Sequence, residues 1–202
     1  MKGVCLVLLL ASAATADTLT FDTAVLGQQL PVTENGYRVR QTAGFHSSVL
    51  DGISPPLTPP YNATRYLNSV FAELTLDRLD GDAFALIAFD GAESVYPQVD
   101  PEWILVTGFR QDGSTVSHRF DIDQVNDGTG PLNDFQTFTL PIGFHNVVAV
   151  SFLGRKQSAL GQADFSMDNV IVGPSVPEPR LVALLLAAGC VALRAQRGRR
   201  VR

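Results

Sequence analysis

The chain has 202 residues, with 20 acidic and 15 basic side chains and a formal net charge of −5. Residues 17–175 carry nineteen of the acids but only eight of the bases, a formal charge of −11, whereas six bases follow residue 175. So acidic a region argues against nucleic acid as a partner, because binding phosphates requires Lys and Arg. Both cysteines, Cys5 and Cys190, lie outside it, which excludes thiolate metal sites, cysteine nucleophiles and redox chemistry there.

The first 16 residues have the features of a secretory signal peptide in the right order. Lys2 supplies a positive charge, an apolar run extends over 4–11, and Ala14 and Ala16 place small residues before Asp17. A buried N-terminal strand or helix is the alternative, but it does not account for this order. The pattern predicts cleavage after Ala16 and export of the rest of the chain.

Residues 17–175 are predicted to form a single all-β domain. Nine stretches rich in Val, Ile, Phe and Thr are separated by Gly, Pro, Asp and Asn, as expected of strands and turns. Between two of them, Asp112-Gly113 supplies the positive φ angles of a tight hairpin. Without an amphipathic helix of more than two turns, the pattern favours a two-sheet antiparallel sandwich of the jelly-roll type. The predicted strands are Thr18–Phe21, Tyr37–Thr42, Val70–Leu76, Ala83–Phe89, Trp103–Phe109, Thr115–Asp121, Phe135–Leu140, Val147–Phe152 and Phe165–Val172.

The domain shows no recognisable catalytic motif. Its histidines are too scattered for an HExxH metal site, and its serine pair at 47 and 48 has no G-x-S-x-G turn around it. Its glutamates stand in ordinary strand-edge contexts, so a noncatalytic protein is favoured. A secreted carbohydrate-active hydrolase that uses a carboxylate pair is the alternative. The residues considered are His46, His118, His145, Glu73, Glu93 and Glu102.

Two aspartates are the candidate ligands of a structural calcium ion, the only cofactor considered. Asp22 follows the first predicted strand and Asp168 lies in the last one. In sandwich-type sugar-binding modules the first and last strands often pair, and a calcium ion sits near them. Carboxylate oxygens are ligands that calcium prefers. Two other acidic segments, 77–82 and 121–128, are interpreted as solvated turns in which Asp binds local backbone groups.

Aromatic side chains are the candidate sugar-binding residues, because the CH faces of sugars stack on flat rings. Tyr61, Tyr66 and Tyr96 are expected in exposed loops and are the candidates for a polysaccharide ligand. Trp103 heads the apolar run WILV and is expected to pack in the core instead.

The C-terminal segment joins a prolyl motif to an apolar run and an arginine cluster. Leu181–Leu193 holds thirteen uncharged residues, which as a helix would span about 20 Å at ~1.5 Å per residue. A hydrocarbon core is ~30 Å thick, so this run is a marginal membrane span. It is apolar on every face, unlike an amphipathic helix of the domain. The arginines after it should stay cytoplasmic and act as a membrane stop: Arg194, Arg197, Arg199, Arg200 and Arg202.

Val176-Pro177-Glu178-Pro179, together with this run and these arginines, resembles the PEP-CTERM sorting signal of Gram-negative bacteria. In that family the motif is recognised by exosortase, a membrane cysteine protease-transpeptidase. Cargo is held transiently in the inner membrane and then goes to the cell surface or the exopolysaccharide matrix. The resemblance implies a signal peptide over 1–16, a cargo domain over 17–175 and a sorting signal over 176–202. The apolar run is shorter than is usual for a membrane helix and follows Arg180 closely.

The domain is also similar, more loosely, to the jelly-roll cargo domains that precede this tail. The shared outline is an early FD-x-x-x-x-G, at Phe21–Gly27, and a closing hydrophobic-x-DN-V strand, at Phe165–Val170. The fold of such domains is akin to that of carbohydrate-binding modules. The resemblance implies a noncatalytic surface or biofilm-matrix protein that associates with exopolysaccharide, and it identifies no ligand.

Overall fold

The computed structural model describes residues 15–51, 60, 64–94, 100–124, 134–157 and 161–175. Within these ranges the chain forms strands and one short 3-10 turn, and all strand pairs are antiparallel, so the predicted all-β class is confirmed. The elements are β1 (Asp17–Leu19), β2 (Val32–Glu34), β3 (Tyr37–Asp51), β4 (Arg65–Arg78), β5 (Phe84–Ala92), β6 (Trp103–Phe109), β7 (Thr115–Asp121), β8 (Gln136–Thr139), η2 (Ile142–Phe144), β9 (Ala149–Arg155) and β10 (Phe165–Pro174).

All nine predicted strands are present, and β2 is an addition to them. β2 pairs with the start of β3 through a turn at Asn35-Gly36, where the two φ angles are 49° and 81°. Asn-Gly is favoured in such two-residue hairpins because both residues tolerate positive φ. This turn is the sequence signal for β2, since three residues, Val32–Glu34, are too few to show an alternating pattern.

The strands β3 and β4 are much longer than predicted, at 15 and 14 residues. They form one hairpin that is paired from Tyr37 with Arg78 to Asp51 with Arg65. The sequence gives no strand signal over 65–69 and 43–51 because these parts are rich in polar residues. Tertiary contacts nonetheless bury Tyr66–Ser69 and Ser47–Val49.

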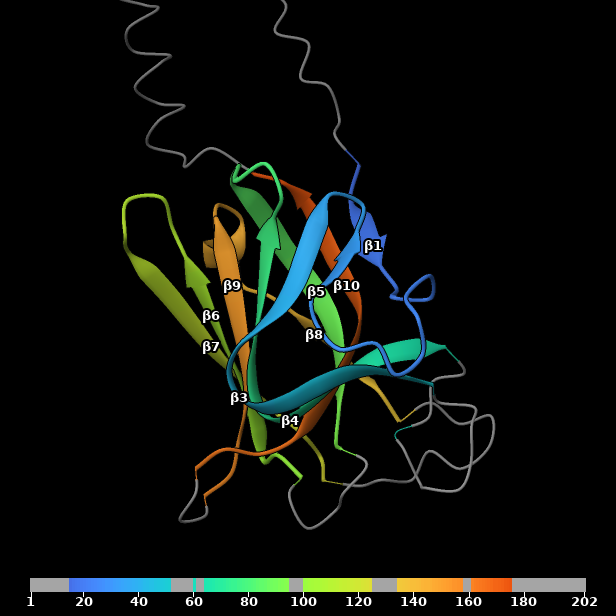
Figure 1. The fold of residues 1–202 in the computed structure, drawn as a ribbon. Helices are drawn as coiled ribbons and strands as arrows, with labels where there is room; N and C mark the ends of the chain where they lie inside the picture. Colours follow the sequence, from blue (N-terminus) through green and yellow to red (C-terminus); the bar gives the residue numbers. More distant parts are fainter. Residues whose placement is uncertain are drawn as a thin grey trace, which may run out of the picture.

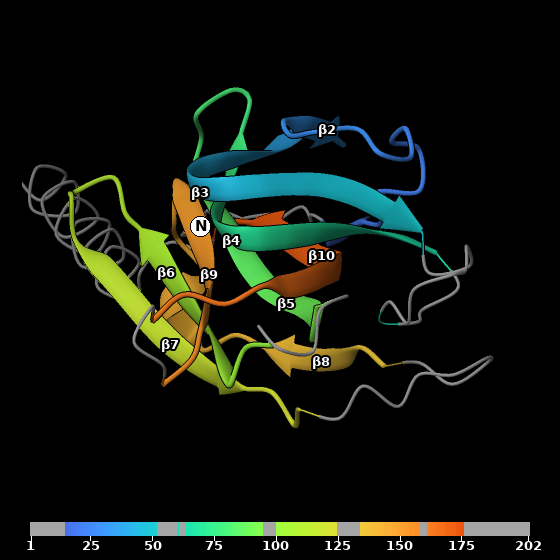
Figure 2. The same ribbon diagram turned by 60° about the horizontal axis from the view of Figure 1, so that its bottom comes forward.

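The sheet has β4 near its centre and curls until it is nearly closed like a barrel (Figures 1 and 2). Its strand order is β7-β6-β9-β4-β10-β5-β8, with β3 also paired to β4 and β1 to β10. The residues of β4 near Leu67 pair with β10, whereas Glu73–Asp77 pair with β9. One hairpin, β3–β4, is therefore shared by both sides of the molecule.

Aromatic rings fill the gap between the edge strands β7 and β8. The ring centres of Phe120 in β7 and Phe138 in β8 lie 5.1 Å apart. Phe89 in β5 is fully buried and contacts both, at 5.5 and 5.4 Å, and it also packs at 5.2 Å on Phe152 in β9. Such offset and edge-to-face pairs add to the free energy of burial. They close the core across this gap.

The β3–β4 hairpin bends sharply where Gly44 crosses Phe71. Gly44 has a φ of 96°, and a Cβ atom there would lie 1.9 Å from the carbonyl oxygen of Phe71. Phe71 itself has a positive φ of 47°, which is unusual for a bulky residue. Its N–H donates to Oδ1 of the fully buried Asp164 over 2.7 Å. The bend thus combines a glycine that permits close approach with a carboxylate that holds the strained residue.

The predicted turn between β6 and β7 is present, with one difference in its backbone. Gly113 has a φ of 82°, but Asp112 is not in the positive-φ region. The Asp112 carboxylate instead accepts a hydrogen bond of 2.9 Å from the N–H of Ser114, and the N–H of Gly113 bonds to the Arg110 carbonyl. This is a turn followed by a left-handed glycine, which a three-residue loop requires.

The domain has two unlike ends. At the terminal end, Asp17 pairs with Val172, so the first and last described strands lie side by side (Figure 1). The short connections β2–β3, β4–β5 and β6–β7 share this end. The longer connections, 52–64, 93–102, 122–135 and 156–164, join strand ends at the opposite end, termed the loop end.

Several predicted features lie outside the described residues. They are the signal peptide up to residue 14, the sorting motif, the apolar run 181–193 and the arginines after it. Tyr61 and Tyr96 also lie outside them. Within the described ranges, no helix has the length and apolar character needed to cross a membrane.

We expect Gly44→Ala to destabilise the fold by roughly 3 kcal/mol. A side chain disfavours the positive φ angle of this residue, and the added methyl group would also displace the Phe71 backbone. The matched control is Gly36→Ala, which has a φ of 81° but no atom within 4 Å of the added Cβ. It should cost only about 1 kcal/mol. Urea unfolding followed by circular dichroism measures both, and equal costs would show that the crossing is not tight.

Candidate functional site

The two predicted calcium ligands are brought together by the pairing of the first and last strands. Asp168 lies in β10, and Asp22 follows β1, which pairs with β10. The Thr64 hydroxyl donates to Oδ2 of Asp168 over 3.0 Å, and the N–H of Arg65 donates to Oδ1 of Asp22 over 3.1 Å. The two carboxylates therefore bind consecutive residues at the start of β4. The FD and DN motifs meet at this point.

Asp168 is fully buried, and its charge is unfavourable there. Burial, together with the charges of Asp22 and Asp90, raises its pKa to about 7, and the hydrogen bonds from the backbone of Asn169 and from Thr64 oppose the shift. A cation beside two such carboxylates would relieve this cost, because an opposite charge favours the ionised form. Across the described part of the chain, no three His, Cys, Asp or Glu side chains are grouped to hold a metal ion.

Tyr66 has no exposed ring for a sugar to stack on. It is fully buried, and its ring packs edge-on against Phe135 at 5.3 Å. Burial, with the negative charges of Asp51 and Asp134 nearby, raises the pKa of its hydroxyl. The sequence places Tyr66 in a loop because polar residues surround it, but the structure places it in β4 with its ring inside.

A cluster of buried carboxyl groups lies at the loop end, and the sequence gives little sign of it. Glu93 is fully buried, so its strand-edge interpretation is wrong. Its Oε1 accepts a 2.7 Å hydrogen bond from the N–H of Gln124, while its Oε2 is buried and has no hydrogen-bond partner in the part of the chain that is described. Burial raises the pKa of Glu93 to about 8, and the nearby charges of Asp134 and Asp123 act in the same direction.

A second part of this cluster joins β4, β5 and β10 through polar side chains. Asn68 accepts long hydrogen bonds from the hydroxyls of Ser94 and Ser166, at 3.4 and 3.3 Å. Asp100 accepts from the N–H of Ser94 over 3.1 Å. Burial raises the pKa of Asp164 to about 6, although its hydrogen bond from Phe71 works against the shift. These groups support the bend and the strand ends, and they are closed off from solvent.

The outer face of the sheet is the widest set of polar side chains outside the core. We define the outer face as the side chains of β3, β4, β9, β6 and β7 that point away from the core. The strand register places them in adjacent rows: Arg38 with Asp77, Ala149, Phe109 and Thr115; Arg40 with Thr75, Ser151, Thr107 and Ser117; Glu73 with Leu153, Leu105 and Arg119; and Arg155 with Trp103 and Asp121. This corrects the prediction for Trp103, which is only half-buried and lies beneath the guanidinium of Arg119, 3.9 Å from its ring centre.

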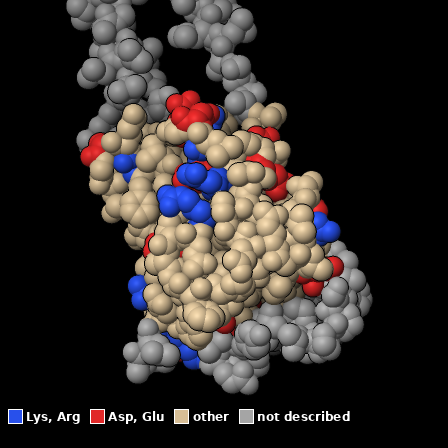
Figure 3. Space-filling model, viewed as in Figure 1, with Lys and Arg blue, Asp and Glu red and all other residues tan. Residues whose placement is uncertain are grey.

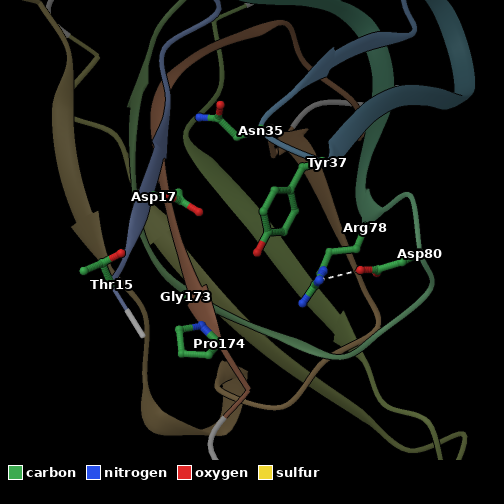
Figure 4. A pocket seen from close by; sticks show the side chains of 9 residues that line it. Thr15, Asp17, Asn35, Tyr37, Arg78, Asp80, Gly173 and Pro174 are labelled. Carbon is green, nitrogen blue, oxygen red and sulfur yellow. Dashed lines mark hydrogen bonds and ion pairs between the residues drawn. The ribbon is translucent and has the colours of Figure 1, made fainter. Parts of the chain in front are cut away.

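A pocket of about 230 Å³ opens at the terminal end (Figure 4). Arg78 lies over the Tyr37 ring at 5.8 Å and pairs with Asp80. Both signs of charge are present, and none of the sequence-predicted ligand residues lines the pocket. The lining residues are Thr15, Asp17, Asn35, Gly36, Tyr37, Arg78, Asp80, Gly173 and Pro174.

The remaining candidates are dispersed or have local partners. His46 is half-buried on β3, His118 packs on Phe120 at 4.6 Å, and His145 follows η2. The acidic turn near Gly81 is confirmed as a local structure, since Asp80 accepts a 3.0 Å hydrogen bond from the N–H of Asp82. The structure brings no two histidines into one site.

Comparison with known proteins adds no assignment. No protein-family model matches the chain. No curated protein matches it either. Its function is therefore inferred from its own residues.

The buried carboxyls predict a stability that falls as pH rises. Folded Glu93 keeps its proton to about pH 8, whereas an unfolded Glu loses it near ~4.3, so the folded state holds an extra proton between these values. The contribution of Glu93 to the unfolding free energy is greatest below about pH 4.3 and is lost as pH rises through about 8. In the Glu93→Gln variant, the decline of the unfolding free energy with rising pH should be smaller by on the order of 1–2 kcal/mol.

The matched control for this experiment is Glu102→Gln. Glu102 is partly exposed and lies in the same connection, so its variant should keep the wild-type slope. Urea unfolding at about pH 5, 6.5 and 8.5 gives the comparison. A Glu93→Gln variant with an unchanged slope would contradict the assigned burial of this charge.

Proposed function

We propose that this protein is a noncatalytic exported domain that exosortase sorts to the cell surface or extracellular matrix of a Gram-negative bacterium, where it associates with exopolysaccharide. The observation that supports this most directly is the pairing of β1 with β10. It puts Asp17, which follows the expected signal cleavage site, beside Val172, which shortly precedes the sorting motif. A tail held in the inner membrane would then tether the domain by its terminal end and leave the loop end pointing outward.

The finer description of the fold belongs to the same proposal. A shared β3–β4 hairpin with β7-β6-β9 on one side and β10-β5-β8 on the other is compatible with a jelly-roll sandwich whose two sheets join through the bent hairpin. Fold alone does not give function. It gives a rigid support and identifies no ligand.

A secreted hydrolase is the alternative, and Glu93 is the residue that favours it. A carboxyl with a raised pKa near a second carboxyl, Asp134, is an arrangement used for general acid catalysis. Glu93, however, has no exposed surface, so a substrate cannot touch it in this structure. A glycosidase screen of the protein and of Glu93→Gln distinguishes the two functions, because only a Glu93-dependent activity would support the hydrolase.

The sorting proposal predicts different failures for different parts of the tail. Replacing Pro177, Glu178 and Pro179 with Ala leaves the apolar run and the arginines intact, so the precursor should reach the membrane and stay there uncleaved. Replacing the five arginines from Arg194 to Arg202 should weaken retention of the tail in the membrane. The thirteen apolar residues before them are fewer than the ~20 that a full membrane span needs, so the run cannot compensate for the lost charges. More unprocessed protein should then appear in the periplasm or medium.

Cell fractionation and intact-mass measurement in a host with its exosortase measure both effects. The unaltered protein is the reference and should lose the arginine cluster on maturation. Mature protein that still carries Arg202 would show that the tail is a plain membrane anchor, and the sorting proposal would be wrong.

Calcium binding by Asp22 and Asp168 is part of the same proposal. Two carboxylates and the Thr64 hydroxyl form an oxygen-only donor set, which suits calcium better than a softer metal. Chelation should lower the melting temperature by several degrees through loss of native-state binding. Asp22→Asn should remove this response, whereas Asp112→Asn in an exposed turn should keep it. An unchanged melting temperature on chelation of the wild type would refute calcium binding.

A further inference from the structure

The outer face carries a row of hydroxyl groups that crosses four strands. Thr75, Ser151, Thr107 and Ser117 are register partners on β4, β9, β6 and β7. At ~4.8 Å between neighbouring strands, the row is about 14 Å long. The hydroxyls of Thr107 and Ser117 lie 3.1 Å apart. Thr75 and Ser151 are only 6% and 5% exposed, and Thr75 shares a 3.0 Å hydrogen bond with the Thr42 hydroxyl. Thr107 and Ser117 are therefore the accessible hydroxyls of the row, and each can donate and accept, as sugar hydroxyls do.

The outer face is less acidic than the rest of the domain. Four of the eight basic residues of 17–175 lie on it, with three carboxylates, for a formal charge of +1 in a domain of −11. In the view of Figure 3, basic side chains gather toward the terminal end above a broad surface with few charges. The basic residues of the outer face are Arg38, Arg40, Arg119 and Arg155.

Arg40 and Arg119 keep donors for a ligand, since Asp121 binds only the Nε of Arg119. Asp77 binds Nε and Nη2 of Arg38 but only Nε of Arg40, over 3.1 Å, so the terminal amino groups of Arg40 are not used by it. The Arg40 and Arg119 side chains are 41% and 54% exposed. Arg40 extends the hydroxyl row at one edge, since it is the register partner of Thr75. Arg119 neighbours the row at the other edge, two residues after Ser117.

Apolar surface lies beside the row. Trp103, Leu105 and Leu153 are partly exposed on the same face, and Arg119 stacks on the Trp103 ring. Sugar rings offer CH groups to such side chains and hydroxyls to Ser and Thr, and uronic acids add carboxylates that suit the guanidinium fork. A carboxylate forms a charge-assisted, bidentate pair with a guanidinium, which a neutral sugar cannot form.

We propose that the outer face binds an acidic, carboxylate-bearing polysaccharide, with Arg40 and Arg119 at either edge and the accessible hydroxyls of Thr107 and Ser117 between them. This inference rests on the proposed association with exopolysaccharide and names its chemical class and its place on the domain. It moves the binding surface away from the tyrosines, of which Tyr66 is buried. The strongly acidic remainder of the domain would repel such a polymer and so confine it to this face.

The test uses the full chain in a mild nonionic detergent, with immobilised alginate as the polyuronate probe and dextran as the neutral one. The wild type should bind alginate, bind dextran at least tenfold more weakly, and lose alginate affinity as salt screens the charges. The double variant Arg40→Gln/Arg119→Gln should bind alginate at least tenfold more weakly. The matched control, Arg78→Gln, removes a positive charge at the terminal pocket and should change affinity less than twofold.

A second variant, Ser117→Glu, adds a negative charge to the exposed edge of the row and should also weaken alginate binding; circular dichroism confirms that each variant is folded. Alginate binding that survives both substitutions would overturn the assigned site while leaving the association with polysaccharide intact. Equal binding of dextran and alginate would overturn the acidic class. A wild type that binds neither these probes nor the exopolysaccharide of its host would overturn the proposed association itself.

Discussion

The fold depends on the crossing of Gly44 over Phe71. β4 pairs with β10 before this point and with β9 after it, so the β3–β4 hairpin must turn from one side of the molecule to the other. A backbone cannot bend this sharply with ordinary side chains in contact, and the chain meets the requirement with a glycine and a strained Phe71. Asp164 binds the N–H of Phe71 and fixes the bend. This bend lets one hairpin take part in both sides of the curled sheet.

Carboxyl groups are buried in this acidic domain where irregular backbone needs acceptors inside the protein. Asp164 accepts from the N–H of Phe71 at the bend in β4, and Glu93 accepts from the N–H of Gln124 after β7. Each acceptor is stabilised by its hydrogen bond and destabilised by burial, and burial dominates for both. Glu93, with a pKa of about 8, is thus buried mostly as a neutral carboxyl at the loop end, while four of the eight basic residues of 17–175 lie on the outer face.

The sequence was a good guide to strands and a poor guide to sites. Alternating apolar residues located all nine predicted strands, and β6 and β7 match to the residue. The pairing of the FD and DN motifs was also predictable, because first and last strands were expected to meet. Glu93, Tyr66 and Trp103 were misplaced, since burial of a polar or aromatic side chain depends on strands far away in the sequence. The polar halves of β3 and β4 were missed for the same reason.

The sequence by itself determined the all-β class, the absence of cysteine chemistry in 17–175, and the tail motif, because these follow from local composition and short-range pattern. The tertiary structure alone decided which side chains share a surface. Thr75, Ser151, Thr107 and Ser117 come from four strands in the order β4, β9, β6 and β7, which no local pattern encodes. Strand register, fixed by core packing on the opposite face, aligns them into one row.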